Sequence, residues 1–344
     1  MPQSSASLQH MKIAVVILNW NGIKFLQQFL RNVVAYSSDL AQIYVADNGS
    51  TDGSVDYVRS QHPEVLILET GGNFGYAGGY NRALSHITEP FAVLLNSDVE
   101  VTSGWLKPLL NLMERDNNVA ACQPKILDFN NKGKFEYAGA SGGFIDSWGF
   151  PFCRGRIFDS LEDDNGQYQS VMPIFWATGA CMFVRMKAFR EVGGLDFDFF
   201  AHMEEIDLCW RFQRAGHTIY VAPESIVYHV GGGTLSKSNP RKTFLNFRNG
   251  LELLLKNLPP NQLIQKLGIR IVLDWLAAWR FLFAGNGNDF LAVFKAHLAF
   301  YGRFISTIQK RGGAYPKLSG MHSRSIVLDY FLRKKKTFSS LWLE

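Results

Sequence analysis

FAVLLNSDVEV, at residues 91–101, is the stretch that decides how the chain folds. An apolar run of strand length leads into Asn96, Ser97 and Asp98, which are small polar residues suited to a turn at the end of a strand. A carboxylate at the carboxyl end of a buried strand lies where open α/β sheets bind their ligands. Asp98 is therefore the first candidate for a role linked to a metal or a phosphate, although Asn-Ser-Asp by itself is also an ordinary turn sequence.

The residues before this stretch alternate strand and helix patterns. Apolar runs at 12–18, 42–46 and 65–68 have strand length, and helical patterns separate them. Asn21 is expected to cap the first helix. Strands joined by helices of this length predict βαβ units, so we expect an α/β fold with a mostly parallel central sheet flanked by helices. The polar loops that follow three of these strands should gather at one edge of that sheet.

Composition limits the class of protein. The chain has 344 residues, 47% of them hydrophobic, which allows one large domain or two ordinary ones. The net charge of +5 is spread thinly up to a basic block at 333–336, so it indicates no nucleic-acid partner and suits an anionic small molecule or membrane surface. Four scattered cysteines predict neither a zinc site nor a disulfide framework. Without a signal peptide or a spanning apolar segment, we expect a cytoplasmic protein.

The sequence GGNFGYAGG at 71–79 is rich in glycine but does not form a dinucleotide-binding fingerprint. Its spacing differs from GxGxxG, and it follows the third predicted strand, whereas that fingerprint belongs after the first. We therefore expect no dehydrogenase. The pattern predicts a loop here, followed by a helix that ends near residue 87.

Four strings resemble, in order and spacing, the family 2 glycosyltransferases of the GT-A fold. They are ILNWNG at 17–22, VADNGSTDGS at 45–54, NFGYAGGYN at 73–81 and LLNSDVE at 94–100. The resemblance covers roughly residues 11–250 and implies a GT-A catalytic domain there, after a disordered segment at 1–10 and before a C-terminal helical region at 251–344. It implies a glycosyltransferase of polysaccharide biosynthesis in the cell envelope, with rhamnosyltransferases as the first subfamily to consider.

The same resemblance implies a donor site for a sugar linked to UDP or dTDP. Asp47 is expected at the nucleobase, and the full set of donor residues is Asn19, Asp47, Asp52, Asn73, Asn81, Asn96 and Asp98. Asp98 would bind the divalent cation, Mn or Mg, together with His229, and diphosphate oxygens and water would complete the coordination. The imidazole favours manganese. This sequence has Asn96 and Ser97 where the family often has carboxylates, and a lone histidine on a predicted strand at 225–230 is more often structural.

The stretch at 204–215 has helical spacing and begins with Glu204, Glu205 and Asp207. The helix dipole explains acidic residues at a helix start, and Asp207 can pair with Arg211 one turn later. The resemblance instead implies that these three residues are catalytic, with Glu205 as the base that takes a proton from the acceptor hydroxyl. A direct displacement with inversion at the anomeric carbon is then expected.

The stretches expected on the acceptor side have a less regular sequence pattern. FWATGACMFVR at 175–185 predicts a strand, and the resemblance implies that Trp176, Thr178 and Gly179 line the acceptor site, while core packing is the alternative for the tryptophan. Residues 128–172 have no clear period and are either a mobile insertion or a wall of the acceptor site.

Basic residues follow the predicted strand at 225–230. The segment 231–234, with Lys237, Arg241 and Lys242, is expected to close over the diphosphate, and Arg248-Asn249 matches a pair often found after this loop.

Residues 251–310 change to long apolar helical patterns with interspersed basic residues. Asp274 and Arg280 interrupt any spanning segment. These helices either rest on an anionic membrane, which would suit a glycan or lipid-linked acceptor, or pack on the catalytic domain or on a second subunit in a homo-oligomer. A protein that binds nucleotide-sugar or glycan without turnover is the alternative function. The joint presence of Asp98, Glu205 and His229 argues against it.

Overall fold

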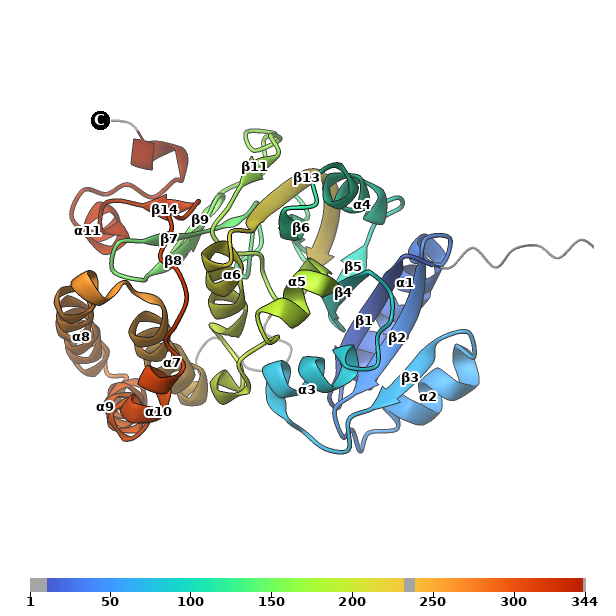
Figure 1. Cartoon of the computed structure of the whole chain (residues 1–344), viewed down its shortest axis with the longest axis horizontal. Coiled ribbons are helices and arrows are strands. Elements are labelled where there is room, and N and C mark those ends of the chain that lie inside the picture. The colour runs from blue at the N-terminus through green and yellow to red at the C-terminus, as the bar shows by residue number, and fades with distance from the viewer. Residues whose placement is uncertain (1–10, 232–238, 343–344) are drawn as a thin grey trace, which may run out of the picture.

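The computed structural model describes residues 11–231 and 239–342, and in this part of the chain nine strands form one mixed sheet (Figure 1). One half of the sheet is parallel and consists of β3 (Leu66–Glu69), β2 (Ala41–Asp47), β1 (Ile13–Asn19) and β4 (Phe91–Asn96), in that order. The connecting helices are α1 (Ile23–Ser37), α2 (Ser54–Gln61) and α3 (Gly75–Leu84). The four strands predicted for this half are confirmed to within one residue at each end.

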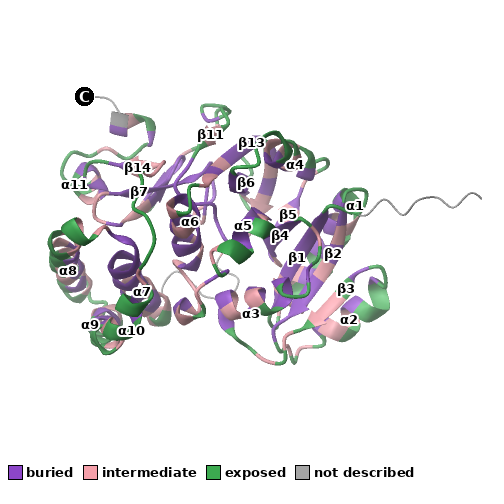
Figure 2. Ribbon diagram, viewed as in Figure 1, coloured by how far each residue is buried: buried purple, intermediate pink, exposed green. Residues whose placement is uncertain are grey.

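The strand β1 is buried on both faces, which explains its uninterrupted apolar sequence (Figure 2). Ala14 and Val16 belong to the core that includes α3 residues. Ile13 and Val15 belong to the opposite core, which includes residues of α1 and α4 (Leu106–Arg115). Helices therefore cover both faces of the parallel half, as the βαβ pattern predicts.

The other half of the sheet changes direction. Its strands are β12 (Cys181–Arg185), antiparallel to β4; β6 (Val119–Asp128), antiparallel to β12; and β13 (Thr218–His229), parallel to β6. Two short strands, β5 (Val99–Val101) and β11 (Met172–Pro173), pair with β13. The strand predicted over 175–185 begins only at Cys181, because Phe175 and Trp176 bond to the backbone of Gly143 instead.

Residues 128–172 contribute a second, smaller sheet. Five strands of the described chain form it in the order β10 (Ser160–Leu161), β9 (Arg156–Ile157), β8 (Pro151–Cys153), β7 (Gly143–Asp146) and β14 (Met321–His322). Phe135, Phe144 and Phe152 are buried there. A mobile insertion does not fit these buried aromatic side chains, so this stretch is packed structure.

The short helices α5 (Met186–Glu191) and η1 (Phe197–Phe199) precede α6 (Glu204–Arg214), which is the predicted acidic helix. The C-terminal region contains α7 (Pro240–Asn257), α8 (Pro260–Phe283), α9 (Gly287–Gly302), α10 (Phe304–Gln309), α11 (Ile326–Phe331) and η2 (Ser339–Trp342). The domain boundary predicted at residue 250 falls inside α7, and Leu253 shares a core with Val16. Among the described helices, none combines the length and apolarity needed to cross a bilayer.

Two local predictions are corrected. Asn21 does not cap α1: its φ is 51°, its Oδ1 accepts from the N–H of Thr51, and the first N–H of the helix bonds to Asp52. The helix α3 begins at Gly75, inside the loop predicted at 71–79. Gly79 permits this close helix packing, because a Cβ there would lie 2.8 Å from the side chain of Leu18.

Candidate functional site

The carboxyl ends of β1, β2 and β4 meet at one edge of the sheet, as predicted. The parallel register places Asn19 opposite Asp47, and it places Asn96 next to β1. Asp47 accepts from the backbone N–H of Ser50 at 3.0 Å, and Asn19 donates to the hydroxyl of Ser50 at 3.1 Å. Oδ1 of Asn19 is buried and has no hydrogen-bond partner among the described residues. This edge therefore offers an unused acceptor in a fixed polar frame.

Asp52 and Asn73 support the loops around this edge. Asp52 accepts the N–H of Ile23 at 2.9 Å, and Asn73 accepts the N–H of Gly75 at 3.0 Å, so each satisfies the first turn of a helix. Asn48, which no sequence pattern singled out, donates to the carbonyl of Gly75 at 3.0 Å. It ties the loop after β2 to the start of α3.

Asn81 lies apart from the other predicted donor residues. Its Nδ2 donates to the carbonyl of Leu195 at 2.6 Å, and its Oδ1 accepts the N–H of the same residue at 3.0 Å. Both ends of the amide are thus used to fasten α3 to the segment before η1. We leave Asn81 out of the donor site.

Asp98 and His229 come together although 131 residues separate them in the sequence. The cause is the antiparallel pairing of β5 with β13, in which Val99 lies opposite His229. Oδ1 of Asp98 lies 3.1 Å from Nε2 of His229, and both residues are buried. Within the described residues, no set of three His, Cys, Asp or Glu side chains is arranged to hold a metal ion. The structure thus brings together the two side chains that were predicted as metal ligands, and their role as ligands stays a prediction.

Glu136 lies on the other side of the His229 ring, where its Oε2 is 3.1 Å from Nδ1. Burial lowers the pKa of His229, but the two carboxylates outweigh burial and raise it to about 10. Sequence reasoning missed Glu136, because a single glutamate in a stretch without period gives no signal. Only the fold brings it to the histidine.

Glu204 and Glu205 begin α6, and Oε2 of each carboxylate is buried without a hydrogen-bond partner in the described chain. Burial raises the pKa of Glu205 to about 7, and backbone N–H groups at the helix start partly oppose this rise. Burial and the charge of Glu205 raise the pKa of Glu204 well above its usual range. Near neutral pH, Glu205 is therefore close to its midpoint, which is the condition that suits a general base, and the raised pKa of Glu204 favours its neutral form beside it.

Asp207 has a different role from these two glutamates. It accepts from Arg211 at 2.8 Å, from Lys256 at 2.9 Å and from Asn257 at 2.8 Å, and it is fully buried. Burial raises the pKa of Asp207, but Arg211 and Lys256 outweigh it and lower the pKa. The predicted pair with Arg211 is confirmed, and the cluster fastens α6 to α7. Asp207 has no free oxygen for a substrate, so we leave it out of the catalytic set.

The turn that leads into α6 is strained. Positive φ values occur at three non-glycine residues, Phe200 (64°), His202 (69°) and Met203 (73°). Nδ2 of Asn249, on α7, lies 2.7–3.0 Å from three backbone carbonyls of residues 199–202. Arg248 bonds to the carbonyl of Phe199 at 3.1 Å. The Arg248-Asn249 pair therefore holds the turn that positions Glu205.

The three predicted acceptor residues are buried. Trp176 donates from Nε1 to the carbonyl of Phe144 at 2.9 Å, so the alternative of core packing is confirmed for it. Thr178 is also buried, and the carbonyl of Gly179 accepts from the hydroxyl of Tyr76 at 2.7 Å. A Cβ at Gly179 would lie 2.7 Å from that hydroxyl. These residues support the site from behind, and we leave them out of the acceptor surface.

Two tyrosines connect the carboxylate pair of α6 with Asp98. The rings of Tyr76 and Tyr80 have centroids 4.6 Å apart. Burial raises the pKa of both hydroxyls, and the charge of Glu205 adds to this rise at Tyr76, whereas the charge of Asp98 adds to it at Tyr80. The charges of Glu205 and Asp98 therefore each reach one hydroxyl of this pair of rings.

Arg156 is a second residue that sequence reasoning missed. It is buried, its Nη2 donates to the sulfur of Cys153 at 3.2 Å, and its Nε has no hydrogen-bond partner among the described residues. Burial raises the pKa of the Cys153 thiol, and the charges of Glu136 and Glu205 add to the rise. Arg156 therefore lies close to Glu136, beside His229, and to Glu205. A buried guanidinium with an unused N–H suits an anionic group of a ligand.

The basic residues expected over the diphosphate are only partly described. Residues 232–234 and Lys237 lie outside the described residues. The guanidinium of Arg241 lies 5.1 Å from the ring of Phe200, and Nζ of Lys242 lies 5.9 Å from the ring of Tyr137. Arg241 thus lies at the strained turn, and Lys242 lies near Tyr137.

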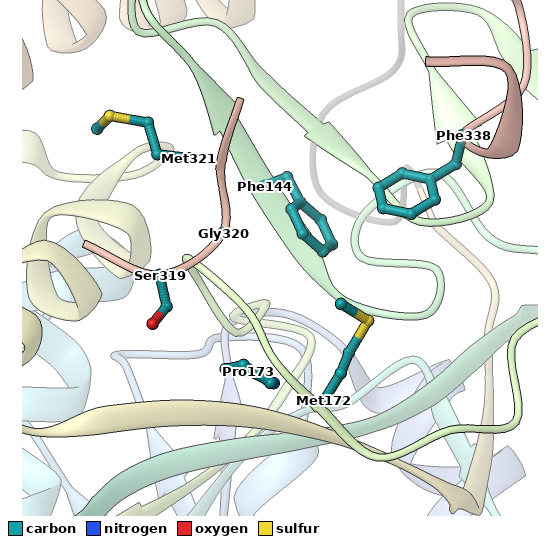
Figure 3. A pocket seen from close by; sticks show the side chains of 7 residues that line it. All are labelled: Phe144, Met172, Pro173, Ser319, Gly320, Met321 and Phe338. Atoms are coloured by element: carbon teal, nitrogen blue, oxygen red, sulfur yellow. The ribbon is translucent and has the colours of Figure 1, made fainter. Parts of the chain in front are cut away.

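An apolar pocket of about 350 Å³ lies outside this site (Figure 3). Its lining residues are Phe144, Met172, Pro173, Ser319, Gly320, Met321 and Phe338. It lies at the opposite end of α6 from Glu205, because Gln213 on the last turn of α6 bonds to the carbonyl of Ser319 at 3.4 Å. Without a charged lining residue, it does not suit a sugar nucleotide.

The sequence has known relatives. The glycosyl transferase family 2 profile matches residues 14–193. The chain is 28% identical over 241 residues to an N-acetylglucosaminyl-diphospho-decaprenol L-rhamnosyltransferase of Mycobacterium tuberculosis, an alignment that covers 64% of this chain and 77% of the relative.

Two solved structures have a similar fold. GalNAc-T7 with UDP, GalNAc and Mn²⁺ has a TM-score of 0.56 at 15% identity, and the match covers 71% of this chain and 47% of that one. The mannosyltransferase from Pyrobaculum calidifontis in complex with GDP-Man and Mn²⁺ has a TM-score of 0.52 at 16% identity, with coverage of 87% and 83%. At these identities the likeness concerns the fold.

Proposed function

The chain belongs to glycosyl transferase family 2 and has the GT-A fold, and we propose that it transfers rhamnose from a UDP- or dTDP-linked donor to a glycan or lipid-linked acceptor. The observation that carries the proposal is the buried approach of Asp98 to His229, and the raised pKa of Glu205 at the start of α6 supports it. The name of the mycobacterial relative supports both rhamnose and a lipid diphosphate acceptor. Such an acceptor would bring the protein to the inner face of the cell membrane.

The donor is proposed to bind along the edge formed by β1, β2 and β4. The buried Oδ1 of Asn19 would accept an N–H from the nucleobase, next to Asp47. Asn96 lies farther along the same edge, before Asp98. Arg156, with its unused Nε–H, would bind an anionic group of the donor or acceptor.

A divalent cation fits the residues at Asp98 and His229. One carboxylate oxygen and one imidazole nitrogen face each other in a buried position, and Glu136 behind the ring is placed as carboxylates that orient metal-bound histidines are. Mn²⁺ in the two similar structures supports a divalent ion, and the imidazole favours manganese over magnesium. When bound, this ion would offset the negative charge that develops on the departing diphosphate.

Glu205 is proposed to take the proton from the acceptor hydroxyl. As the hydroxyl oxygen forms its bond to the anomeric carbon, the bond from that carbon to the diphosphate breaks, and the configuration inverts. The raised pKa of Glu204 favours its neutral form beside Glu205, so the two carboxyls do not both carry charge.

Calorimetric titration of the full chain with UDP and dTDP, with and without Mn²⁺, tests the donor site, and product formation from dTDP-rhamnose tests transfer. Nucleotide binding that needs the metal, together with transfer, supports the proposal, and the preferred base identifies the donor. If neither nucleotide binds with metal present, the donor site is wrongly assigned. Binding without transfer to any glycan or lipid-linked acceptor would favour the non-catalytic alternative.

We expect the substitution Glu136→Gln to weaken Mn²⁺ binding by about 10- to 100-fold, because His229 then loses the carboxylate that orients its ring. Titration of the UDP-saturated protein with Mn²⁺ measures the change. Glu162→Gln is the matched control, since Glu162 lies in the same irregular stretch and bonds to Tyr168. Equal Mn²⁺ affinity in the Glu136 variant and the wild type would show that Glu136 does not position the histidine.

The substitution Asn249→Ala is expected to lower the free energy of unfolding by about 2 kcal/mol, since it leaves buried carbonyls of the strained turn without their donor. We also expect kcat to fall, because the turn positions Glu205. Denaturant unfolding and steady-state kinetics measure the two effects. A variant that loses stability with an unchanged kcat would mean that the turn has no positioning role.

A further inference from the structure

The helices α8 and α9 expose an apolar face to solvent, on the side of the molecule away from β1, β2 and β3 (Figures 1 and 2). We define this apolar face by its exposed members Ile264, Val272, Leu276, Trp279 and Phe283 on α8, Leu291, Phe294, Leu298 and Tyr301 on α9, and Ile305 on α10. The exposed fraction reaches 88% for Ile264 and 84% for Phe283. Soluble monomeric proteins rarely expose a contiguous patch of this kind unless it binds something.

The members recur every three or four residues from Val272 to Phe283 and from Leu291 to Ile305, so each set forms one stripe along its helix. The opposite side of each helix is buried, and both helices pack against α7. Ring contacts between Trp279 and Phe290, with centroids 5.5 Å apart, join α8 to α9 beside the stripes. The two stripes therefore make one surface.

Exposed basic residues lie on the same two helices as the apolar face. Residues 253–342 contain fourteen Lys and Arg but only three acidic residues. Those three are already engaged: Asp274 with Arg270, Asp329 with Arg333, and Asp289 with the hydroxyl of Thr243. The exposed basic residues nearest the face in sequence are Arg280 and Lys295.

Basic residues also follow α11. The guanidinium of Arg280 lies 5.0 Å from the ring of Phe331, which places this helix beside α8. Leu332 is 73% exposed, and Lys334 and Lys336 are exposed directly after it. Apolar and basic side chains thus alternate along this end of the surface.

We propose that the apolar face binds an anionic lipid bilayer. A bilayer surface takes both features at once, because apolar side chains enter the acyl boundary while Lys and Arg meet anionic headgroups. Trp279 and Tyr301 have the amphipathic rings that favour this interface. A second copy of the same face would instead bring two sets of basic residues together, and like charges disfavour that pairing.

The proposed membrane contact rests on the proposed function in one respect: it would bring the site to a lipid-linked acceptor. The test is co-sedimentation of the full chain with vesicles of phosphatidylcholine alone or with phosphatidylglycerol added. The triple variant Leu276→Gln, Trp279→Gln, Phe283→Gln is compared with a control, Tyr36→Gln, Leu66→Gln, Val171→Gln, which changes three exposed large hydrophobic side chains elsewhere. Analytical ultracentrifugation gives the oligomeric state of each.

We expect the wild type and the control to bind the anionic vesicles, and the triple variant to bind them at least tenfold more weakly. Substituting Arg280 and Lys295 with glutamine should also weaken binding. Equal binding to neutral and anionic vesicles, or equal binding by the triple variant, would overturn the proposal. A dimer that only the triple variant breaks would also overturn it and assign the face to a second copy. Transfer to a short water-soluble acceptor should be unchanged in the triple variant. A failure of the proposed function would therefore be seen as absent transfer in the wild type, whereas a failure of the membrane proposal would be seen in vesicle binding.

Discussion

Glu205→Gln is expected to lower kcat for sugar transfer by about two to four orders of magnitude, the range that general-base catalysis contributes. The glutamine keeps the size and the position at the start of α6 but cannot take the proton from the acceptor hydroxyl. Affinity for the donor should be unchanged, because the proposed donor edge is built by β1, β2 and β4, whereas Glu205 belongs to α6. Steady-state kinetics and nucleotide titration separate the two quantities.

The pH profile gives this prediction a second readout. With a pKa of about 7 for Glu205, wild-type transfer should fall about tenfold per unit as the pH drops below 7, since the protonated carboxyl is no longer a base. The variant should lack this acidic limb. The raised pKa also means that ionising Glu205 destabilises the folded chain, a cost absent at pH 4 and complete above pH 7. The variant should therefore be more stable than the wild type at pH 8, by about 3 kcal/mol.

Glu204→Gln is the matched control for this prediction. Because burial raises the pKa of Glu204 and so favours its neutral form, its replacement by the neutral glutamine should change the charge of the site little. We expect transfer to remain within about tenfold of the wild type, with the acidic limb still present. Loss of transfer in Glu204→Gln with retention in Glu205→Gln would reverse the assignment of the base.

The parts of this fold that the sequence predicts are those dictated by burial and register. β1 and β4 lie under helices on both faces, so their apolar runs mark their ends closely. Parallel pairing then brings Asn19 next to Asp47 without any long-range information. The α6 carboxylates were predictable from a helical pattern with acidic residues in its first turn.

The remaining site residues depend on contacts that no pattern encodes. Glu136 and Arg156 lie in a stretch without period, and only the second sheet brings them to His229 and Cys153. Motif resemblance also cannot separate a residue that meets a ligand from one that supports it. Asn81 and Trp176 occur in matching strings, yet their polar atoms are bonded to the chain itself.

Asp98→Ala is expected to weaken nucleotide binding in the presence of Mn²⁺ by more than about 100-fold, because a proposed direct ligand should matter more than the residues that orient ligands. Without metal, the variant and the wild type should bind the nucleotide equally weakly. Glu136 still faces His229 after the substitution, so the buried imidazole keeps one carboxylate partner and the chain should fold. Calorimetric titration with UDP and dTDP, with and without Mn²⁺, measures all of these quantities.

Glu100→Ala is the control that separates the metal role from a change in β5. Glu100 lies on β5, two residues after Asp98, which is in the turn before that strand, and its carboxylate pairs with Nζ of Lys132 at 2.6 Å. This variant should bind nucleotide with the metal dependence of the wild type. If the metal dependence survives in Asp98→Ala, the ion is held elsewhere, and the convergence of Asp98 with His229 is a structural ion pair. If it is lost only in Asp98→Ala, the pairing of β5 with β13 is what creates the metal site from two residues that the sequence keeps far apart.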